Sequence, residues 1–200
     1  MKILGLFLFL AAAAISLVCY GSQETARDKA ISGSQQCSEG WKITGYFTPV
    51  EADYPKDETK EVTVRGNKLS FSSQFLRAII TEGWGKTDAG WYLGYDHETQ
   101  RWQRSSAPLD DNGEALQIGM IAADESVLRQ NSKVKIPALP DDWGKRTFTV
   151  TDIGLTEFGE VSVKNKHIDV YTGEGKEAGE ETFAISHVYP DELVKVCEVQ

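Results

Sequence analysis

The chain has 200 residues, 40% of them hydrophobic, which is enough for one domain with a sizeable core. It carries 21 Lys and Arg residues against 30 Asp and Glu residues, a net charge of −9. A nucleic-acid partner is not expected, because no basic stripe is present to neutralise phosphates. An anionic ligand would have to be held by stacking and hydrogen bonds rather than by long-range attraction.

The first residues are typical of a secretory signal peptide, expected over residues 1–21. Lys2 precedes an apolar run over residues 3–18 that is slightly short for a membrane span, although a retained anchor is an alternative. Cys19 allows a lipoprotein, which the bulky Val18 before it disfavours. We expect an exported protein, periplasmic or associated with the cell wall or outer membrane, with no stable membrane span after cleavage.

Two cysteines remain after cleavage, Cys37 and Cys197, and they lie near the two ends of the mature chain. An even pair in an exported protein predicts a disulfide. Closing such a long loop contributes roughly 4–5 kcal/mol in the chain-entropy model. Residues 22–40 are polar, so we expect a flexible leader ahead of a domain over residues 41–200.

The domain begins with a predicted strand. Residues 41–48 alternate apolar and polar side chains, and Pro49 ends the regular pairing. Tyr46 and Thr48 then point to the same face, because side chains alternate along a strand. Tyr46 is either a groove residue or an ordinary core residue.

A charged loop, a short strand and a helix are expected next. Residues 51–60 form the loop, and residues 61–66 alternate as the second strand. Apolar side chains at helical spacing predict a helix over residues 73–82, with Ser72 as its N-cap.

The following segment is rich in aromatic residues and glycine: Trp84, Trp91, Tyr92, Tyr95 and Trp102. Exposed aromatic rings on glycine-rich loops can stack on sugar rings, whereas buried ones form a satellite core. Some of each are expected. Trp84 is the preferred ligand contact because glycines flank it, followed by the pair Trp91 and Tyr92.

The second half reads as short strands separated by turns. Asn112-Gly113 marks a turn within residues 108–113, and short β-type runs follow from Leu116 onward. Many short strands in one domain favour a barrel. Residues 182–186 and 194–199 are expected to supply its edge strands.

Three aspartates border or interrupt these runs: Asp124, Asp152 and Asp169. A carboxylate beside a strand is held rigidly, as a catalytic acid requires. Taken singly, Asp124 and Asp152 also fit as turn or cap residues. Burial or a second carboxylate nearby would raise the pKa of one of them enough to donate a proton near neutral pH.

In order, the sequence reads Asp124, Thr151-Asp152-Ile-Gly154 and Lys164-Asn-Lys-His167-Ile-Asp169-Val-Tyr171. This set resembles the three-aspartate (3D) domain of the membrane-bound lytic transglycosylase A family, and residues 43–49 resemble its first strand. The resemblance implies a mainly β fold. Its core would be a six-stranded double-psi β-barrel with one short helix and an aromatic-rich insertion at about residues 68–105.

The resemblance also implies an activity, a peptidoglycan lytic transglycosylase that cleaves between N-acetylmuramic acid and N-acetylglucosamine and leaves 1,6-anhydro ends. Asp169 would be the acid and base, with Asp152 orienting it or stabilising charge, and Asp124 assisting from further away or serving structure. The implied substrate contacts are Tyr46, Thr48, Trp84, Lys164, His167 and Tyr171. Glycan strands are the expected partner, no cofactor is implied, and we expect a monomer.

The sequence departs from the family at several places beside the site. Leu155 and Asn165 stand where glycines are usual, the spacing from Asp152 to Asp169 is longer, and residues 129–131 replace a usual Pro-Leu-Gly. These departures motivate an alternative, a glycan-binding wall module that has lost turnover.

Two other chemistries are not expected. The three histidines, His97, His167 and His187, show no zinc-ligand spacing, so no metal is expected. No nucleophile-elbow sequence occurs, which argues against a Ser-His-Asp hydrolase.

Overall fold

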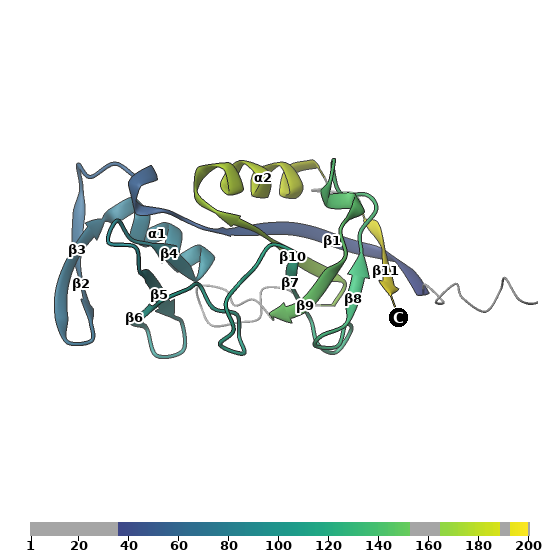
Figure 1. The fold of residues 1–200 in the computed structure, drawn as a ribbon, viewed down its shortest axis with the longest axis horizontal. Coiled ribbons are helices and arrows are strands. Elements are labelled where there is room, and N and C mark those ends of the chain that lie inside the picture. Colours follow the sequence, from purple (N-terminus) through teal and green to yellow (C-terminus); the bar gives the residue numbers. More distant parts are fainter. Residues whose placement is uncertain (1–35, 153–164, 189–192, 200) are drawn as a thin grey trace, which may run out of the picture. The chain divides into compact units, whose positions relative to one another are not determined.

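The computed structural model describes residues 36–152, 165–188 and 193–199. The fold is mainly β, as predicted, and six strands close a barrel in the order β1-β10-β7-β9-β8-β11 (Figure 1). The barrel strands are β1 (Gln36–Thr48), β7 (Met120–Ala123), β8 (Lys133–Lys135), β9 (Phe148–Asp152), β10 (His167–Glu174) and β11 (Val194–Val199).

A second sheet of five strands follows β1 in the chain, in the order β3-β2-β6-β5-β4. Its elements are β2 (Thr59–Val64), β3 (Asn67–Ser72), helix α1 (Ser73–Glu82), β4 (Trp84–Lys86), β5 (Tyr92–Asp96) and β6 (Arg101–Ser105). Two 3-10 turns complete the description, η1 (Glu51–Asp53) and η2 (Trp143–Lys145). The inserted sheet therefore begins at Thr59, earlier than the predicted residue 68.

The barrel is filled by alternate side chains of its strands. Val170 of β10, Ile121 of β7 and Val150 of β9 lie in register and are fully buried. Ile43 of β1 pairs with Ile168 of β10 and is buried with it. Because side chains alternate, the residues between these positions point out of the barrel, and they form the site described below.

The inserted sheet has its own core, under α1. The helix begins at the predicted place, with Phe75 N–H donating to the Ser72 hydroxyl. Phe75 and Ile79 lie so close to Gly85 that a Cβ there would meet them at 2.5–2.7 Å. Glycine in β4 thus permits the helix to pack directly on the strand.

The first strand starts earlier than predicted, at Gln36 rather than residue 41. Cys37 lies opposite Cys197 in the β1–β11 pairing, and the two form the predicted disulfide, 160 residues apart in sequence. The end of the expected leader therefore belongs to the barrel, because backbone pairing and the disulfide fix it. Residues 1–35, with the predicted signal peptide, lie outside the described part of the chain.

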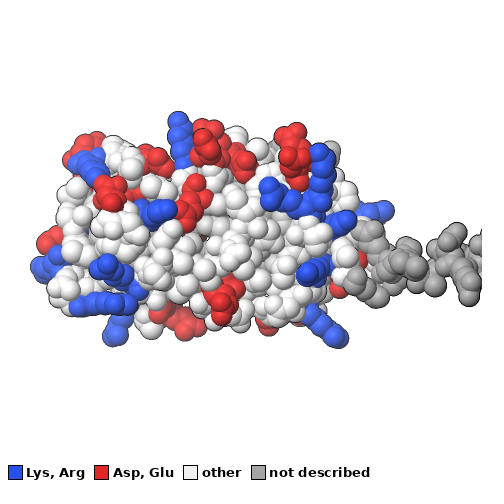
Figure 2. Space-filling view, viewed as in Figure 1, with Lys and Arg blue, Asp and Glu red and all other residues white. Residues whose placement is uncertain are grey.

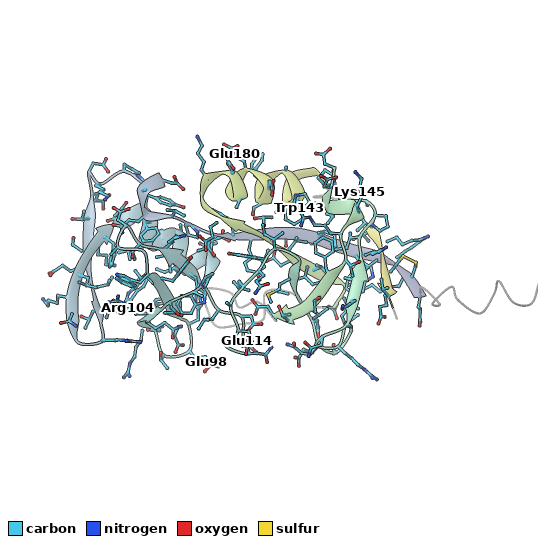
Figure 3. All side chains as sticks on the ribbon, viewed as in Figure 1. Glu98, Arg104, Glu114, Trp143, Lys145 and Glu180 are labelled. Carbon is cyan, nitrogen blue, oxygen red and sulfur yellow. A yellow bond between two sulfur atoms is a disulfide. The ribbon has the colours of Figure 1, made fainter. Side chains whose placement is uncertain are left out.

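The predicted edge strand at residues 182–186 is wrong, because this segment belongs to α2 (Gly175–Val188). Ala178, Thr182 and Ile185 share the inner face at helical spacing, while Glu180 points away from the strands (Figure 3). Five residues read alone resembled a strand, whereas the full segment has the helical period. The described residues therefore form two α-helices, whereas the sequence predicted only one.

Helix α2 packs on β1 and β10 (Figure 1). Gly45 N–H donates to the Ser186 hydroxyl at 3.0 Å, which ties the helix to the strand that carries the site. Within the described ranges, no helix combines the length and apolar character needed to cross a membrane.

Candidate active site

A row of side chains crosses four adjacent barrel strands on their outer face. Thr44 of β1 pairs with Asp169 of β10, Asp169 with Ala122 of β7, and Ala122 with Asp152 of β9. Residues in register on one face are direct neighbours. The small side chain of Ala122 leaves space between the two aspartates, which are both partly open to solvent. The strand pairing thus brings together two of the three predicted aspartates.

One of the two carboxyl oxygens of Asp169, Oδ1, is fixed by a hydrogen bond. The Thr44 hydroxyl donates to its Oδ1 at 3.0 Å, and His167 Nε2 lies 2.7 Å from the same hydroxyl. Because the hydroxyl gives its single proton to the carboxylate, the imidazole must donate to the hydroxyl. Oδ2 is then the oxygen on which Asp169 can carry a proton toward a ligand.

The surroundings of Asp169 favour its protonated form. Burial raises the pKa of Asp169 to about 7, and the nearby charge of Asp152 adds to the effect. The hydrogen bond from Thr44 and the charge of Lys42 act in the opposite direction. A substantial fraction of the protein therefore has a carboxylic acid at this position near neutral pH.

Asp152 accepts a hydrogen bond from a tyrosine. The Tyr46 hydroxyl donates to Asp152 Oδ2 at 3.3 Å, and its ring lies 5.2 Å from that of Tyr171. Burial raises the pKa of Tyr46 well above its usual value, and the charges of Asp152 and Asp169 add to this. Tyr46 therefore stays protonated and remains a hydrogen-bond donor.

Tyr171 and Thr48 lie further along the same two strands. Their hydroxyls are 2.9 Å apart, and both side chains are buried. Burial raises the pKa of Tyr171 to about 12. Being buried, they position the wall of the site more than they offer contacts to a ligand, which refines their predicted role as substrate contacts.

Asp124 has a different environment from the other two aspartates. Its Oδ1 accepts from the backbone and hydroxyl of Ser126, at 2.9 and 2.6 Å, and its Oδ2 accepts from Asn165 N–H at 2.8 Å. These bonds hold the pKa of Asp124 below its usual value. Through these bonds it ties the end of β7 to the start of β10.

Two departures from the family pattern have a conformational explanation. Asn165 has a φ of +57° and Asn131 a φ of +63°. Each stands where the family that the sequence resembles usually has glycine, and asparagine is the other residue that readily adopts this left-handed conformation. These positions therefore keep the backbone that a glycine would give. Leu155 and the predicted contact Lys164 lie outside the described residues.

Sequence reasoning missed Glu82, the last residue of α1. The backbone N–H of Phe47 donates to its Oε2 at 3.1 Å, so the inserted unit reaches β1 beside Tyr46. Burial raises the pKa of Glu82 to about 7, and the charge of Asp169 adds to it. An acid in the last turn of a helix opposes the helix dipole, and that was the signal available in the sequence.

The inserted sheet also contacts the far end of β10. Glu174 accepts from Lys86 Nζ at 2.8 Å and from the Tyr92 hydroxyl at 2.6 Å. Tyr92 is thus bonded within the protein. Trp91 lies with an edge toward Phe71, and the Arg104 guanidinium lies 4.5 Å above it.

Trp84 does not present the exposed stacking face that we expected. Only 9% of the residue is exposed, and a Cβ added to Gly94 would meet its ring at 2.6 Å. Gly83 ends α1, whereas Gly85 and Gly94 lie in strands and accommodate α1 and the Trp84 ring at close range. Trp84 is therefore a buried residue of the inserted sheet, on the face opposite to α1, because Gly85 next to it is the residue that packs on the helix.

On the face shown in Figure 2, acidic and basic side chains are interspersed, and uncharged residues form much of the surface between them. Within the described ranges, no group of three or more His, Cys, Asp or Glu side chains is arranged to hold a metal ion. The described residues thus bring together two carboxyls whose pKa is raised to about 7, Asp169 and Glu82, with Asp152 in the same row as Asp169.

No model of a protein family matches the sequence, and no curated protein matches it. Solved structures do match. The structure of Escherichia coli MltA with bound chitohexaose aligns with a TM-score of 0.58 at 15% identity, covering 80% of this chain and 71% of that one.

Two further structures align similarly. A membrane-bound lytic murein transglycosylase from Agrobacterium tumefaciens gives a TM-score of 0.51 at 11% identity, over 82% of this chain and 76% of that one. MltA from Neisseria gonorrhoeae gives 0.50 at 11%, over 82% and 72%. The fold of this chain is thus similar to that of the MltA lytic transglycosylases.

Proposed function

We propose that this protein is an exported lytic transglycosylase of peptidoglycan, with Asp169 as its acid and base. The observation that carries the proposal is the state of Asp169, a partly exposed carboxyl whose pKa lies at about 7, in a fold similar to that of MltA. A catalytic acid works best when its pKa lies near the working pH. Export is supported by the signal-peptide pattern and by the disulfide, which belongs to oxidising compartments.

The reaction begins with proton transfer. Protonated Asp169 gives its proton to the glycosidic oxygen between N-acetylmuramic acid and N-acetylglucosamine, the bond from that oxygen to C1 breaks, and the N-acetylglucosamine side leaves as an alcohol. Asp169 then takes the proton of the C6 hydroxyl while that oxygen bonds to C1. The product has a 1,6-anhydro ring, Asp169 is protonated again, and no water is consumed.

The neighbours of Asp169 have supporting roles. Thr44 holds Oδ1 and so directs the acid through Oδ2, with His167 orienting the hydroxyl. Asp152, held by Tyr46, supplies negative charge that stabilises positive charge developing at the sugar ring. Glu82 adds a further acidic group from the inserted unit, and its interaction with Asp169 disfavours ionising both.

The alternative of a non-catalytic glycan-binding module rested on departures from the family pattern. Two of these, at positions 131 and 165, keep the left-handed backbone that glycine would provide. They therefore give no reason to expect lost turnover. The remaining departures are at Arg129 and Gln130 and within residues 153–164, and the latter lie outside the described part of the chain.

The test is digestion of purified sacculi by the mature protein, followed by mass spectrometry of the soluble fragments. We expect muropeptides with 1,6-anhydro ends. Reducing ends alone would identify a hydrolase. Binding to sacculi without release of any fragment would establish the alternative module.

A further inference from the structure

A polar cavity of about 720 Å³ lies on the outer face of β7 and β9, next to the carboxylate row. Met120 and Thr149 line it and pair with each other across β7 and β9. Met120 lies two residues before Ala122 in β7. Two residues along a strand span roughly 7 Å, so the cavity is a neighbour of the site and shares its face of the barrel. Figure 3 places Glu114, another lining residue, on the loop that leads into β7.

Thr151, which lines the cavity, carries a buried hydroxyl that is unpartnered within the described residues. Thr151 is 8% exposed, and among the described residues its Oγ has no hydrogen-bond partner. The pairing of β9 with β7 shifts register at this residue, and such a bulge re-aims a side chain. By contrast, its backbone carbonyl accepts from Asn112 Nδ2 at 3.0 Å. A buried unpaired hydroxyl is costly, so a ligand that bonds it would recover that cost.

The lining indicates the chemistry of that ligand. Amide and hydroxyl side chains predominate, and Ile118, 52% exposed, adds an apolar surface at the rim. Asp110 and Glu114 are acidic, and the part of the lining that the structure describes includes neither Lys nor Arg. Amides, hydroxyls and an apolar patch suit a sugar ring with an amide substituent, whereas the two acids and the lack of cations disfavour an anionic unit.

We propose that this cavity is a subsite for a neutral N-acetylhexosamine unit that carries no peptide, with the Thr151 hydroxyl as a specificity-determining contact. The inference rests on the proposed function, since it places the next sugar of the glycan strand beside Asp169. It adds that the protein selects the unsubstituted sugar on this side of the carboxylate row.

The experiment measures binding of chitotetraose, a neutral N-acetylglucosamine oligomer, by isothermal titration calorimetry. The mature protein carries Asp169→Asn throughout, so that turnover does not affect the result. Thr151→Val keeps the shape and removes the hydroxyl, and it should weaken binding roughly three- to tenfold. Thr151→Ser should restore it, and Thr63→Val, at an exposed position of β2, should bind like the parent.

Ile118→Ser, at the exposed rim, provides a second variant if Thr151→Val does not fold, and it too should weaken binding severalfold. Equal affinity of these variants and the parent, absent binding of chitotetraose, or affinity that falls steeply with salt would each overturn the subsite. The proposed function fails separately: sacculi left intact by the wild type, together with Thr151-dependent binding, would remove the activity and keep the subsite. Anhydro products together with binding that does not depend on Thr151 would keep the activity and remove the subsite.

Discussion

The barrel and the inserted sheet use their side chains in opposite ways. The barrel buries aliphatic residues inside and presents Thr44, Asp169 and Asp152 on its outer face, where they share one row. The inserted sheet buries Phe71 and Phe75 in a core of its own, with Trp91, Tyr95 and Trp102 partly buried against it. Trp84 is nearly buried as well. Aromatic richness therefore marks a structural core here, whereas the row of Thr44, Asp169 and Asp152 lies on the strands of the barrel.

The largest expected effect is on the barrel side. Asp169→Asn should lower the rate of release of soluble fragments from sacculi by about 10²- to 10⁴-fold, the range for loss of a general acid. The fold should be kept, because the amide occupies the same space and accepts from Thr44. Asp142→Asn, at an exposed aspartate beside Lys145, is the matched control and should retain full activity. Residual activity above a tenth of wild type would remove Asp169 from the proposed role.

The inserted sheet should respond in stability instead. Trp84→Ala leaves a cavity against Gly94 and should lower the free energy of unfolding by about 3–5 kcal/mol, measured by urea denaturation. Trp102→Ala, at a partly buried position against the core of the inserted sheet, should cost less. A stable Trp84→Ala protein with weakened glycan binding would instead restore the stacking role that the sequence suggested.

Glu82 is where the inserted unit meets the barrel, so its substitution has a smaller and mixed effect. Glu82→Gln removes a charge that disfavours ionisation of Asp169. The alkaline limb of the pH–rate profile should move to lower pH by less than about one unit. Glu98→Gln, an exposed glutamate of the same inserted unit, should leave the profile in place. An unshifted profile for Glu82→Gln would mean that the charge of Glu82 does not affect the ionisation of Asp169.

The smallest effect concerns the dependence of stability on pH. Unfolded aspartate has a pKa of about 4, and folded Asp169 one of about 7. Between these values the folded protein holds more protons, so the free energy of unfolding falls as pH rises through this window. Asp169→Asn should therefore be more stable than wild type at pH 8, by about 1–2 kcal/mol after allowance for solvent screening, and nearly equal at pH 4.

Thermal unfolding of both proteins across this pH range measures the difference. Asp124→Asn serves as the contrasting variant, since the pKa of Asp124 is lowered and its ionised form is stabilised by hydrogen bonds. That variant should be less stable than wild type at pH 8. A constant difference between wild type and Asp169→Asn at all pH values would contradict the raised pKa.

The sequence predicted what local periodicity and chemistry determine. Alternation located the strand that carries Tyr46, the Ser72 cap marked the start of α1, and the cysteine pair indicated the disulfide. The many short strands favoured a barrel, whereas its six-stranded form came from the resemblance, because short strands alone do not specify how they pair. The three aspartates were identified together from the sequence. The structure then places Asp152 and Asp169 in one row, whereas Asp124 is bonded to Ser126 and Asn165.

The failures share a physical cause, since they depend on contacts between distant segments. The helical period of residues 175–188 appears only over the whole segment, where small residues such as Gly179 face the Phe47 ring. The burial of Trp84 depends on Gly94 in the next strand, and the role of Glu82 depends on β1. None of these contacts is encoded in the neighbouring sequence.

The central claim, that Asp169 is the proton donor, can be tested at the carboxyl itself. We would label the protein with carbon-13 at the aspartate carboxyl carbons and follow their NMR shifts with pH, assigning Asp169 by the signal lost in Asp169→Asn. We predict a midpoint near pH 7 for this carboxyl and, for Asp124, a midpoint lower than that of an ordinary aspartate. A midpoint for Asp169 near 4, the value of an ordinary exposed aspartate, would contradict it.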